Sequence, residues 1–179
     1  VGKVQPLEML SVVTTTWGEW KKLHPKTEVL SPDTGHERDY GEGVAYREYF
    51  SHDRLMFPVS VQDPRLANKA EVLTLRDGDD ALAVPIAELP PESLLSLQLG
   101  SRSLLVIHRA GKRVYEVGEQ RFQELTSEGV REVGGGLWRI EEDALVGPSG
   151  QRLRRFPSHQ AFWFGWVAAY PKTRLWSRR

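Results

Sequence analysis

The chain has 179 residues, 40% of them hydrophobic, and it contains no cysteine. This length is enough for one domain with a packed core, and the missing thiols exclude disulfides, thiolate nucleophiles and cysteine-ligated metal sites. The 24 Lys and Arg balance the 24 Asp and Glu, so the formal net charge is zero, which argues against nucleic acid as the main partner.

A short helix is predicted over residues 14–24. Thr16 and Glu19 have the spacing of a capping box, and Trp17 and Trp20 fall on one apolar stripe, which predicts that both tryptophans pack in a core. Pro25 ends the helix, because the residue before a proline is displaced from helical conformations. The alternation over residues 27–30 predicts an extended segment.

Residues 31–70 combine turn chemistry with aromatic side chains. The aromatic content argues against disorder, so we expect a long ordered loop with little regular structure. Its densest polar stretch supplies the speculative binding residues of the chain. These are Asp33, Thr34, Gly35, His36, Arg38, Asp39 and Tyr40.

Two interpretations of that polar stretch stay open. It is a recognition loop, or, as we favour, Arg38 and Asp39 tie a long loop to the core by charge-assisted hydrogen bonds. The tripeptide at 33–35 matches that of aspartic proteases, whose chemistry needs two carboxylates. Ser31-Pro32 stands where such a site needs an apolar strand, so an Asx turn is expected instead.

Residues 71–157 predict antiparallel β-hairpins in series, each with a Gly-containing turn. One helical turn is also expected within Leu89–Leu97. The paired strands are Val72–Arg76 with Ala81–Ile86, Ser103–Arg109 with Arg113–Val117, Val130–Val133 with Leu137–Ile140, and Ala144–Val146 with Gln151–Phe156.

A second helix is predicted after these hairpins, with Ser158 as its N-cap and Pro171 as its stop. Trp163 and Trp166 lie on its apolar stripe and are expected in the core. Residues 173–176 are expected to be extended. Hairpins followed by a helix and a strand predict a mainly β fold of the α+β class, with two short Trp-rich helices.

The two helical segments form an internal repeat. Trp17, Trp20 and Pro25-Lys26-Thr27 recur as Trp163, Trp166 and Pro171-Lys172-Thr173, at a constant offset of 146 residues. We therefore expect duplicated units within one compact structure. Residues 1–30 are then the tail of a first unit whose front is absent, residues 31–70 the long loop, and residues 71–179 a complete second unit.

Charge is unevenly distributed along the chain. Residues 151–179 carry seven Lys and Arg and no acid, whereas residues 71–92 carry six acids and one base. Intramolecular pairing is the expected use of this asymmetry, with an anion-binding surface as the sharper alternative. The five histidines show no metal-binding spacing, and no apolar run is long enough to span a membrane. No catalytic residue, metal or cofactor is predicted.

The ordered phrases of this chain resemble those of the bacterial and archaeal domain of unknown function 3179. The resemblance implies a two-unit, usually exported protein whose earlier unit carries a Cys-Pro-Leu-Cys motif suggestive of thiol chemistry. This chain has no such motif, and the corresponding strand, Ser103–His108, has no thiol. The phrases are Thr16-Trp17-Gly18-Glu19-Trp20, His24-Pro25-Lys26-Thr27, Val29-Leu30-Ser31, Asp33-Thr34-Gly35, Arg38-Asp39-Tyr40, Phe57-Pro58-Val59 and Phe162-Trp163-Phe164-Gly165-Trp166.

Two functions follow as hypotheses. The preferred one is a non-enzymatic binding or scaffold domain, with residues 33–40 as its recognition or bracing element. The alternative is an accessory of a redox or other enzyme whose Cys-bearing catalytic unit is missing from this chain. The expected partner is then an N-terminal unit or another chain. An extracytoplasmic location follows from the resemblance alone, and the sparse Asn and absent Cys hint at a thermophilic source.

Overall fold

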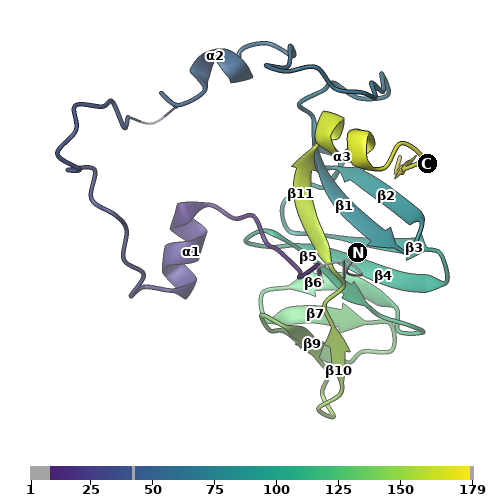
Figure 1. Ribbon diagram of the computed structural model, residues 1–179. Helices are drawn as coiled ribbons and strands as arrows, with labels where there is room; N and C mark the ends of the chain where they lie inside the picture. The colour runs from purple at the N-terminus through teal and green to yellow at the C-terminus, as the bar shows by residue number, and fades with distance from the viewer. Residues whose placement is uncertain (1–8, 42, 178–179) are drawn as a thin grey trace, which may run out of the picture.

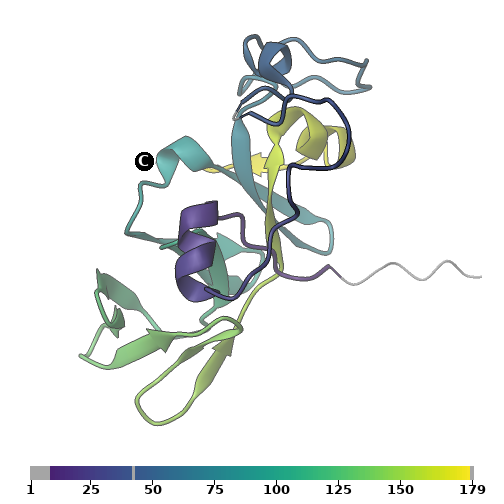
Figure 2. The same cartoon turned by 90° about the vertical axis from the view of Figure 1, so that its left-hand side faces the viewer.

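The computed structural model describes residues 9–41 and 43–177 of the chain. Its described strands all lie after residue 70, and they form three antiparallel or mixed sheets. Residues 9–70 form an arm, which leaves the sheets near α1 (Trp17–Leu23), follows a wide arc through α2 (Arg47–Phe50) and returns close to α3 (Trp163–Ala169) (Figure 1, Figure 2). The expected mainly β fold is confirmed.

The first sheet has the order β11-β1-β2-β12. Its central hairpin, β1 (Glu71–Asp77) and β2 (Asp80–Pro85), turns at Gly78, whose φ of +57° suits glycine. β11 (Ser158–Phe162) pairs antiparallel with β1, and the short β12 (Arg174–Leu175) pairs parallel with β2. Two central strands thus hold two outer strands that come from the end of the chain.

The helix α3 covers one face of this sheet. Trp163 and Trp166 pack with Val72, Ala81 and Ala83, and these residues are buried. The two alanines leave room for indole rings, whose large apolar area drives the packing. The prediction that the second tryptophan pair lies in the core is therefore confirmed.

The remaining strands complete the core in two further sheets. Leucines and valines of the first and second sheets pack together, and Trp138 and Tyr115 lie in a separate cluster with Leu105. The second sheet has the order β3-β4-β5 and the third β10-β9-β8-β7-β6. Their bounds are Ser93–Leu99 (β3), Arg102–His108 (β4), Lys112–Glu116 (β5), Phe122–Thr126 (β6), Gly129–Glu132 (β7), Leu137–Ile140 (β8), Ala144–Val146 (β9) and Arg152–Arg154 (β10).

Two local predictions were wrong. A helical turn was expected within Leu89–Leu97, but the structure has a 3-10 turn just before that stretch, η1 (Ile86–Glu88). The second half of the stretch belongs to strand β3. Ser158 is the first residue of β11 rather than a helix N-cap, because β1 offers it a pairing partner in Leu75. In both places strand pairing, of β3 with β4 and of β11 with β1, took the place of the expected helical residues.

The arm adds no buried residue between positions 9 and 70 of the described chain. Its later part is held to the β region by specific contacts. The Asp53 carboxylate accepts hydrogen bonds from the backbone N–H of Asn68 (3.1 Å) and Lys69 (3.1 Å), and the Arg65 guanidinium bonds Asp63 and the Thr173 carbonyl. Phe50 lies against Phe162 across the same junction.

Candidate functional site

The two Trp-rich segments fold alike. We call residues 17–30 the first hook and residues 163–176 the second hook. Each begins with a seven-residue helix, α1 or α3, that follows an extended N-cap residue. The prediction that Thr16 caps α1 is confirmed, since its side chain accepts a hydrogen bond from the Glu19 N–H at 3.2 Å.

The hydrogen bonds inside the hooks are also repeated. The Trp20 indole N–H donates to the Thr27 hydroxyl at 2.9 Å, and the Trp166 indole N–H donates to Thr173 at 2.8 Å. The residue before each proline, His24 or Tyr170, donates its N–H to the carbonyl of the preceding tryptophan at 2.8 Å. The sequence repeat is thus a repeat of structure, down to the bonds that close each turn.

The two hooks differ in what they contact. Trp163 and Trp166 are 0% and 4% exposed, whereas Trp17 and Trp20 are 48% and 40% exposed. The prediction that both pairs pack in a core is therefore wrong for the first pair. The apolar side chains around it, Leu23, Val29 and Leu30, are also exposed.

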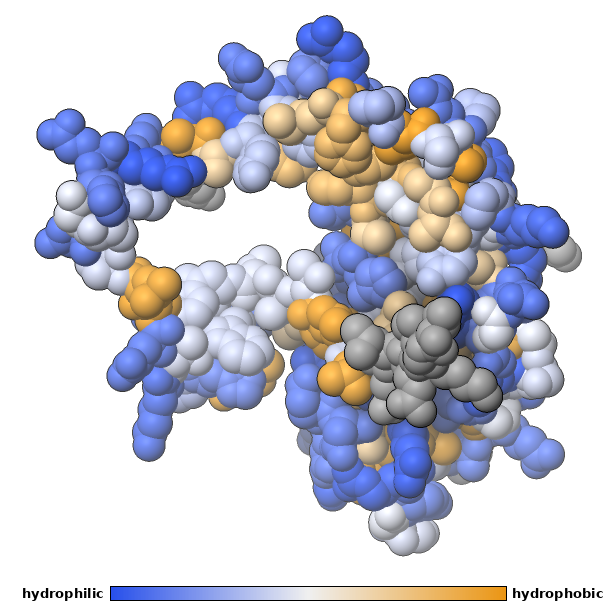
Figure 3. Space-filling model, viewed as in Figure 1, coloured by the Kyte–Doolittle hydropathy of each residue, from blue (hydrophilic) through white to orange (hydrophobic). Residues whose placement is uncertain are grey.

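The exposed face of the first hook does not turn toward the body of the chain. A groove of about 690 Å³ separates α1 from the turns of the second and third sheets, and Glu19, Lys22 and Leu23 line it from the helix side. Neither Trp17 nor Trp20 lines it. Figure 3 shows open space between the arm and the β region.

The second hook shows how such a hook binds a sheet. Beyond its helix, β12 runs alongside β2, with Arg174 opposite Leu82 and Leu175 opposite Ala83. The Arg174 guanidinium bonds both carboxylate oxygens of Asp80, at 3.1 and 3.0 Å. The helix α3 thus packs on a face of the β1–β2 hairpin, while the short strand β12 pairs with the edge of β2.

The segment before the first hook crosses the end of β11. The Val12 N–H donates to the Ser158 carbonyl at 2.9 Å, and the Ser11 hydroxyl donates to the Phe156 carbonyl at 3.0 Å. Gly111 lets this segment approach, because a Cβ there would lie 2.9 Å from the Thr14 carbonyl oxygen. Val12 and Ser158 are equivalent under the 146-residue offset, so the crossing joins like positions of the two repeats.

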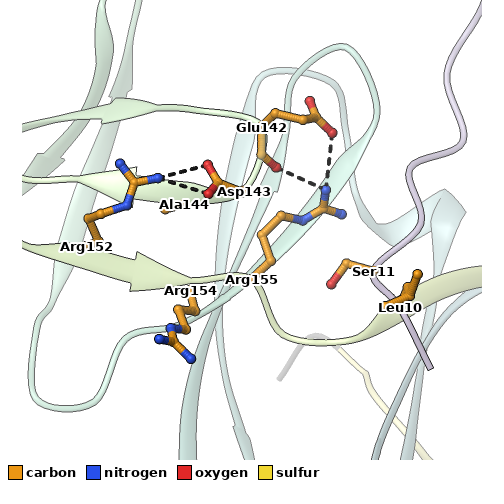
Figure 4. Close-up of a pocket in the computed structure, with 8 residues that line it drawn as sticks. All are labelled: Leu10, Ser11, Glu142, Asp143, Ala144, Arg152, Arg154 and Arg155. Atoms are coloured by element: carbon orange, nitrogen blue, oxygen red, sulfur yellow. Dashed lines mark hydrogen bonds and ion pairs between the residues drawn. The ribbon is translucent and has the colours of Figure 1, made fainter. Parts of the chain in front are cut away.

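A pocket of about 790 Å³ lies beside the crossing (Figure 4). Arg155 forms part of its wall, and its guanidinium bonds the Glu142 backbone carbonyl at 3.2 Å and the Glu142 carboxylate at 3.4 Å. Its side chain is only 8% exposed, and this burial lowers the pKa of Arg155, although an arginine stays charged. The Nε and Nη2 atoms have no partner among the described residues.

Other unpaired polar atoms lie on the two crossing segments. The hydroxyls of Thr15 and Ser158 are buried without a partner in the described part of the chain. Nearby, burial raises the pKa of the Tyr115 phenol to about 12, and its hydroxyl donates to the Glu141 carbonyl at 3.4 Å. Tyr115 is therefore a neutral structural group, whereas Arg155, Thr15 and Ser158 retain unused hydrogen-bonding capacity.

The basic C-terminal segment pairs with acids, but mostly not with those expected. Arg174 does bind Asp80 of residues 71–92. Arg152 instead bridges Glu141 and Asp143, which lie in the preceding strand connection. Hydrogen bonds from Arg139 and Arg152 lower the pKa of the Glu141 carboxyl. Of the three bases of this segment with ion pairs in the described chain, Arg152 and Arg155 thus pair beside the third sheet and only Arg174 pairs with an acid of residues 71–92.

The predicted binding residues 33–40 are exposed, and their contacts lie within the loop itself. The Thr34 hydroxyl and the Tyr40 hydroxyl are 3.1 Å apart, and the Arg38 guanidinium lies 5.9 Å from the Tyr40 ring centroid. Asp39 accepts a hydrogen bond from the Gly41 N–H at 2.8 Å. The contacts of Arg38 and Asp39 are thus with loop neighbours and not with the core, where the bracing interpretation expects them.

The fixed ties of the arm come from residues that the sequence reading did not single out. Hydrogen bonds from the Asn68 and Lys69 backbone lower the pKa of Asp53, and a hydrogen bond from Arg65 lowers that of Asp63. The Asp63 carbonyl also accepts from the buried Trp163 indole N–H at 2.9 Å, so Asp63 positions both α3 and the arm.

Within residues 9–41 and 43–177, no three His, Asp or Glu side chains gather as metal ligands would. None of the helices in the same ranges is long and apolar enough to cross a membrane.

Comparison with known proteins gives one family. No curated protein and no solved structure matches the chain. The profile of the family described as "Protein of unknown function (DUF3179)" matches residues 2–173, which is nearly the whole chain. The chain therefore belongs to this family, as its tryptophan phrases indicated.

Proposed function

We propose that this chain is a non-enzymatic binding or scaffold domain whose working surface is the exposed face of the first hook. One observation carries the proposal: the same hook occurs twice, and only the second copy has a sheet beneath it. The exposed face is apolar rather than titratable, which suits packing against a protein better than proton transfer.

The size of the exposed face supports a protein partner. An indole buries roughly 150–250 Å² when covered, and full burial of a Leu or Val side chain contributes about 1.5–3 kcal/mol. The exposed parts of Trp17, Trp20 and Leu30 therefore offer apolar surface that a protein partner can cover. Their display on a hydrogen-bonded hook lowers the entropic cost of ordering them.

The loop at residues 33–40 is the second element of the proposal. Its donors and acceptors face solvent, and their contacts are local, so a partner seated on the first hook has access to Arg38 and His36 a few residues further along. We propose that the loop contributes polar contacts at the rim of the interface, as rims generally do.

The proposal is tested by grafting the sequence of the first hook into the position of the second. In the full chain, residues 163–176 are replaced by the sequence of residues 17–30, with Val167 retained because it is buried and its equivalent is Lys21. We expect a cooperatively folded protein, since both tryptophans and the closing Thr keep their places.

The matched control carries the same graft with alanine at both tryptophan positions. We expect it to lose cooperative thermal unfolding, because removing a buried tryptophan costs about 3–5 kcal/mol. If the graft with tryptophans melts no more cooperatively than the control, the first hook does not pack on a sheet and the proposed function is overturned.

A further inference from the structure

We propose that the partner of the first hook is a β-hairpin in a further unit of this same fold, and that it is not the hairpin of a second copy of this chain. This inference rests on the proposed function and names its partner. It is carried by sheet topology and by charge.

The topology identifies a hairpin. Under the 146-residue offset, Val12–Thr16 is equivalent to β11, α1 to α3, and Glu28–Val29 to β12. These are the two outer strands and the helix of a four-stranded sheet in the order β11-β1-β2-β12. The two central strands have no equivalent in the described chain. The first repeat therefore presents the edges of a sheet around the place of a missing hairpin.

The unmet pairing capacity agrees with this topology. In the second repeat, β11 pairs with β1 from Ser158 to Phe162. In the first repeat, residues 12–16 belong to no strand, and Glu28–Val29 likewise lies outside any described strand. Extended backbone that lies outside a sheet, next to an apolar helix face, is a template for β-strand addition. A β-hairpin can form backbone hydrogen bonds with both segments at once, whereas a helix can form them with neither.

Charge disfavours the hairpin of a second copy. In the second repeat, Arg174 binds Asp80 at the start of β2. The equivalent of Arg174 is Glu28, which would meet Asp80 as a like charge. Lys21 likewise stands where α3 has the buried Val167. Moreover, β1–β2 is already covered by α3. The matching hairpin therefore has a base opposite Glu28 and an acceptor near Lys21.

The inferred base opposite Glu28 is tested with the grafted chain described above, in which the β1–β2 hairpin takes the place of the partner. In the unaltered chain, Asp80→Arg places two bases together, and we expect the Tm to fall by about 1–3 °C. In the graft, the residue at position 174 is glutamate, so the same Asp80→Arg change should raise the Tm by about as much.

Asp79→Arg is the matched control, since it changes the net charge equally at an exposed neighbouring turn position and should shift both proteins alike. A graft that folds but shows no inversion at Asp80 overturns the identified partner and leaves the proposed function standing. A graft that fails to fold overturns the proposed function itself, so the two failures are distinguishable.

The exclusion of a second copy is tested by sedimentation of the full chain. We expect the 20.3 kDa monomer at micromolar concentration. A dimer that dissociates when Trp17 and Trp20 are both replaced by alanine would show that two copies occupy each other's first hook, and would overturn the inference.

Discussion

Trp163 and Trp17 occupy equivalent positions in the two hooks, yet their surroundings give them different contributions to the stability of the fold. Trp163 is fully buried, its indole N–H donates to the Asp63 carbonyl, and the Arg65 guanidinium lies 5.2 Å from its ring centroid. Trp17 has no sheet beneath it. The identity of a residue and its helical register therefore do not determine what it contributes to stability.

Paired alanine substitutions should separate these roles. We expect Trp163→Ala to lower the free energy of unfolding by about 3–5 kcal/mol, through lost burial and a cavity. Trp17→Ala should cost less than about 1 kcal/mol, as exposed substitutions generally do. Urea denaturation followed by far-UV circular dichroism measures both. Equal losses would contradict the assignment of Trp17 to an uncovered face.

The sequence does contain a signal that the two helices differ in burial, but the apolar stripe alone does not reveal it. Lys21 and Lys22 stand in α1 where α3 has Val167 and Ala168. The stripe correctly predicted which residues share a helix face. It was silent on whether a sheet covers that face, because periodicity reports amphipathicity and not the partner. Only a comparison of the two repeats, position by position, carries that information.

At the scale of elements, turn chemistry predicted the hairpins well. The four predicted strand pairs correspond to β1–β2, β4–β5, β7–β8 and β9–β10. Strands β3, β6 and β11 were not predicted. β3 and β6 pair with the next strand along the chain, across the turns at residues 100–101 and 127–128, and only β11 pairs with a distant strand. Ser158–Phe162 has the local pattern of a helix start and becomes a strand only because β1 is there to pair with it.

The loop connecting the repeats illustrates the same limit. Its aromatic content predicted order, but nothing in the local sequence indicated that Asp53 would bind the backbone of Asn68 and Lys69. That contact joins residues some fifteen positions apart, and it fixes the end of the loop against the first sheet. The polar residues at 33–40, which looked more important in the sequence, make contacts only with their neighbours.

Replacing Asp53 should therefore loosen the loop. We expect trypsin at pH 8 to cleave Asp53→Ala several-fold faster than the unaltered chain around Arg47 and Arg54, because the loop opens locally more often. Asp39→Ala is the matched control: its carboxylate bonds only Gly41, so cleavage at the same sites should not change. Equal acceleration by both substitutions would contradict the tie at Asp53.

The pH dependence of this tie follows from the pKa of Asp53. The Asn68 and Lys69 N–H groups lower that pKa below its ordinary value of 3.8. The stabilisation is therefore present above pH 3.8 and is lost as the pH falls through the lowered pKa of the folded state. The difference in pepsin cleavage between the unaltered chain and Asp53→Ala should accordingly shrink as the pH is lowered progressively below 3.8.

At the scale of the whole molecule, stability is divided between two regions. The buried residues of the described chain all lie in the β region, from Val72 onward. The arm is held by its own helix caps and by a few polar ties.

Native-state hydrogen exchange should resolve these two regions. We expect amides of β1 and β4, which are paired on both sides, to exchange only through global unfolding. The last-turn amides of α1 should exchange faster by at least about a hundredfold, since opening α1 uncovers almost no buried apolar surface. In α3, which has the same length and the same closing bonds, the equivalent amides of Val167 to Ala169 should match those of β1. The two helices thus control for one another: equal protection in α1 and α3 would mean that intrinsic helix stability, and not the sheet beneath, holds the hook together.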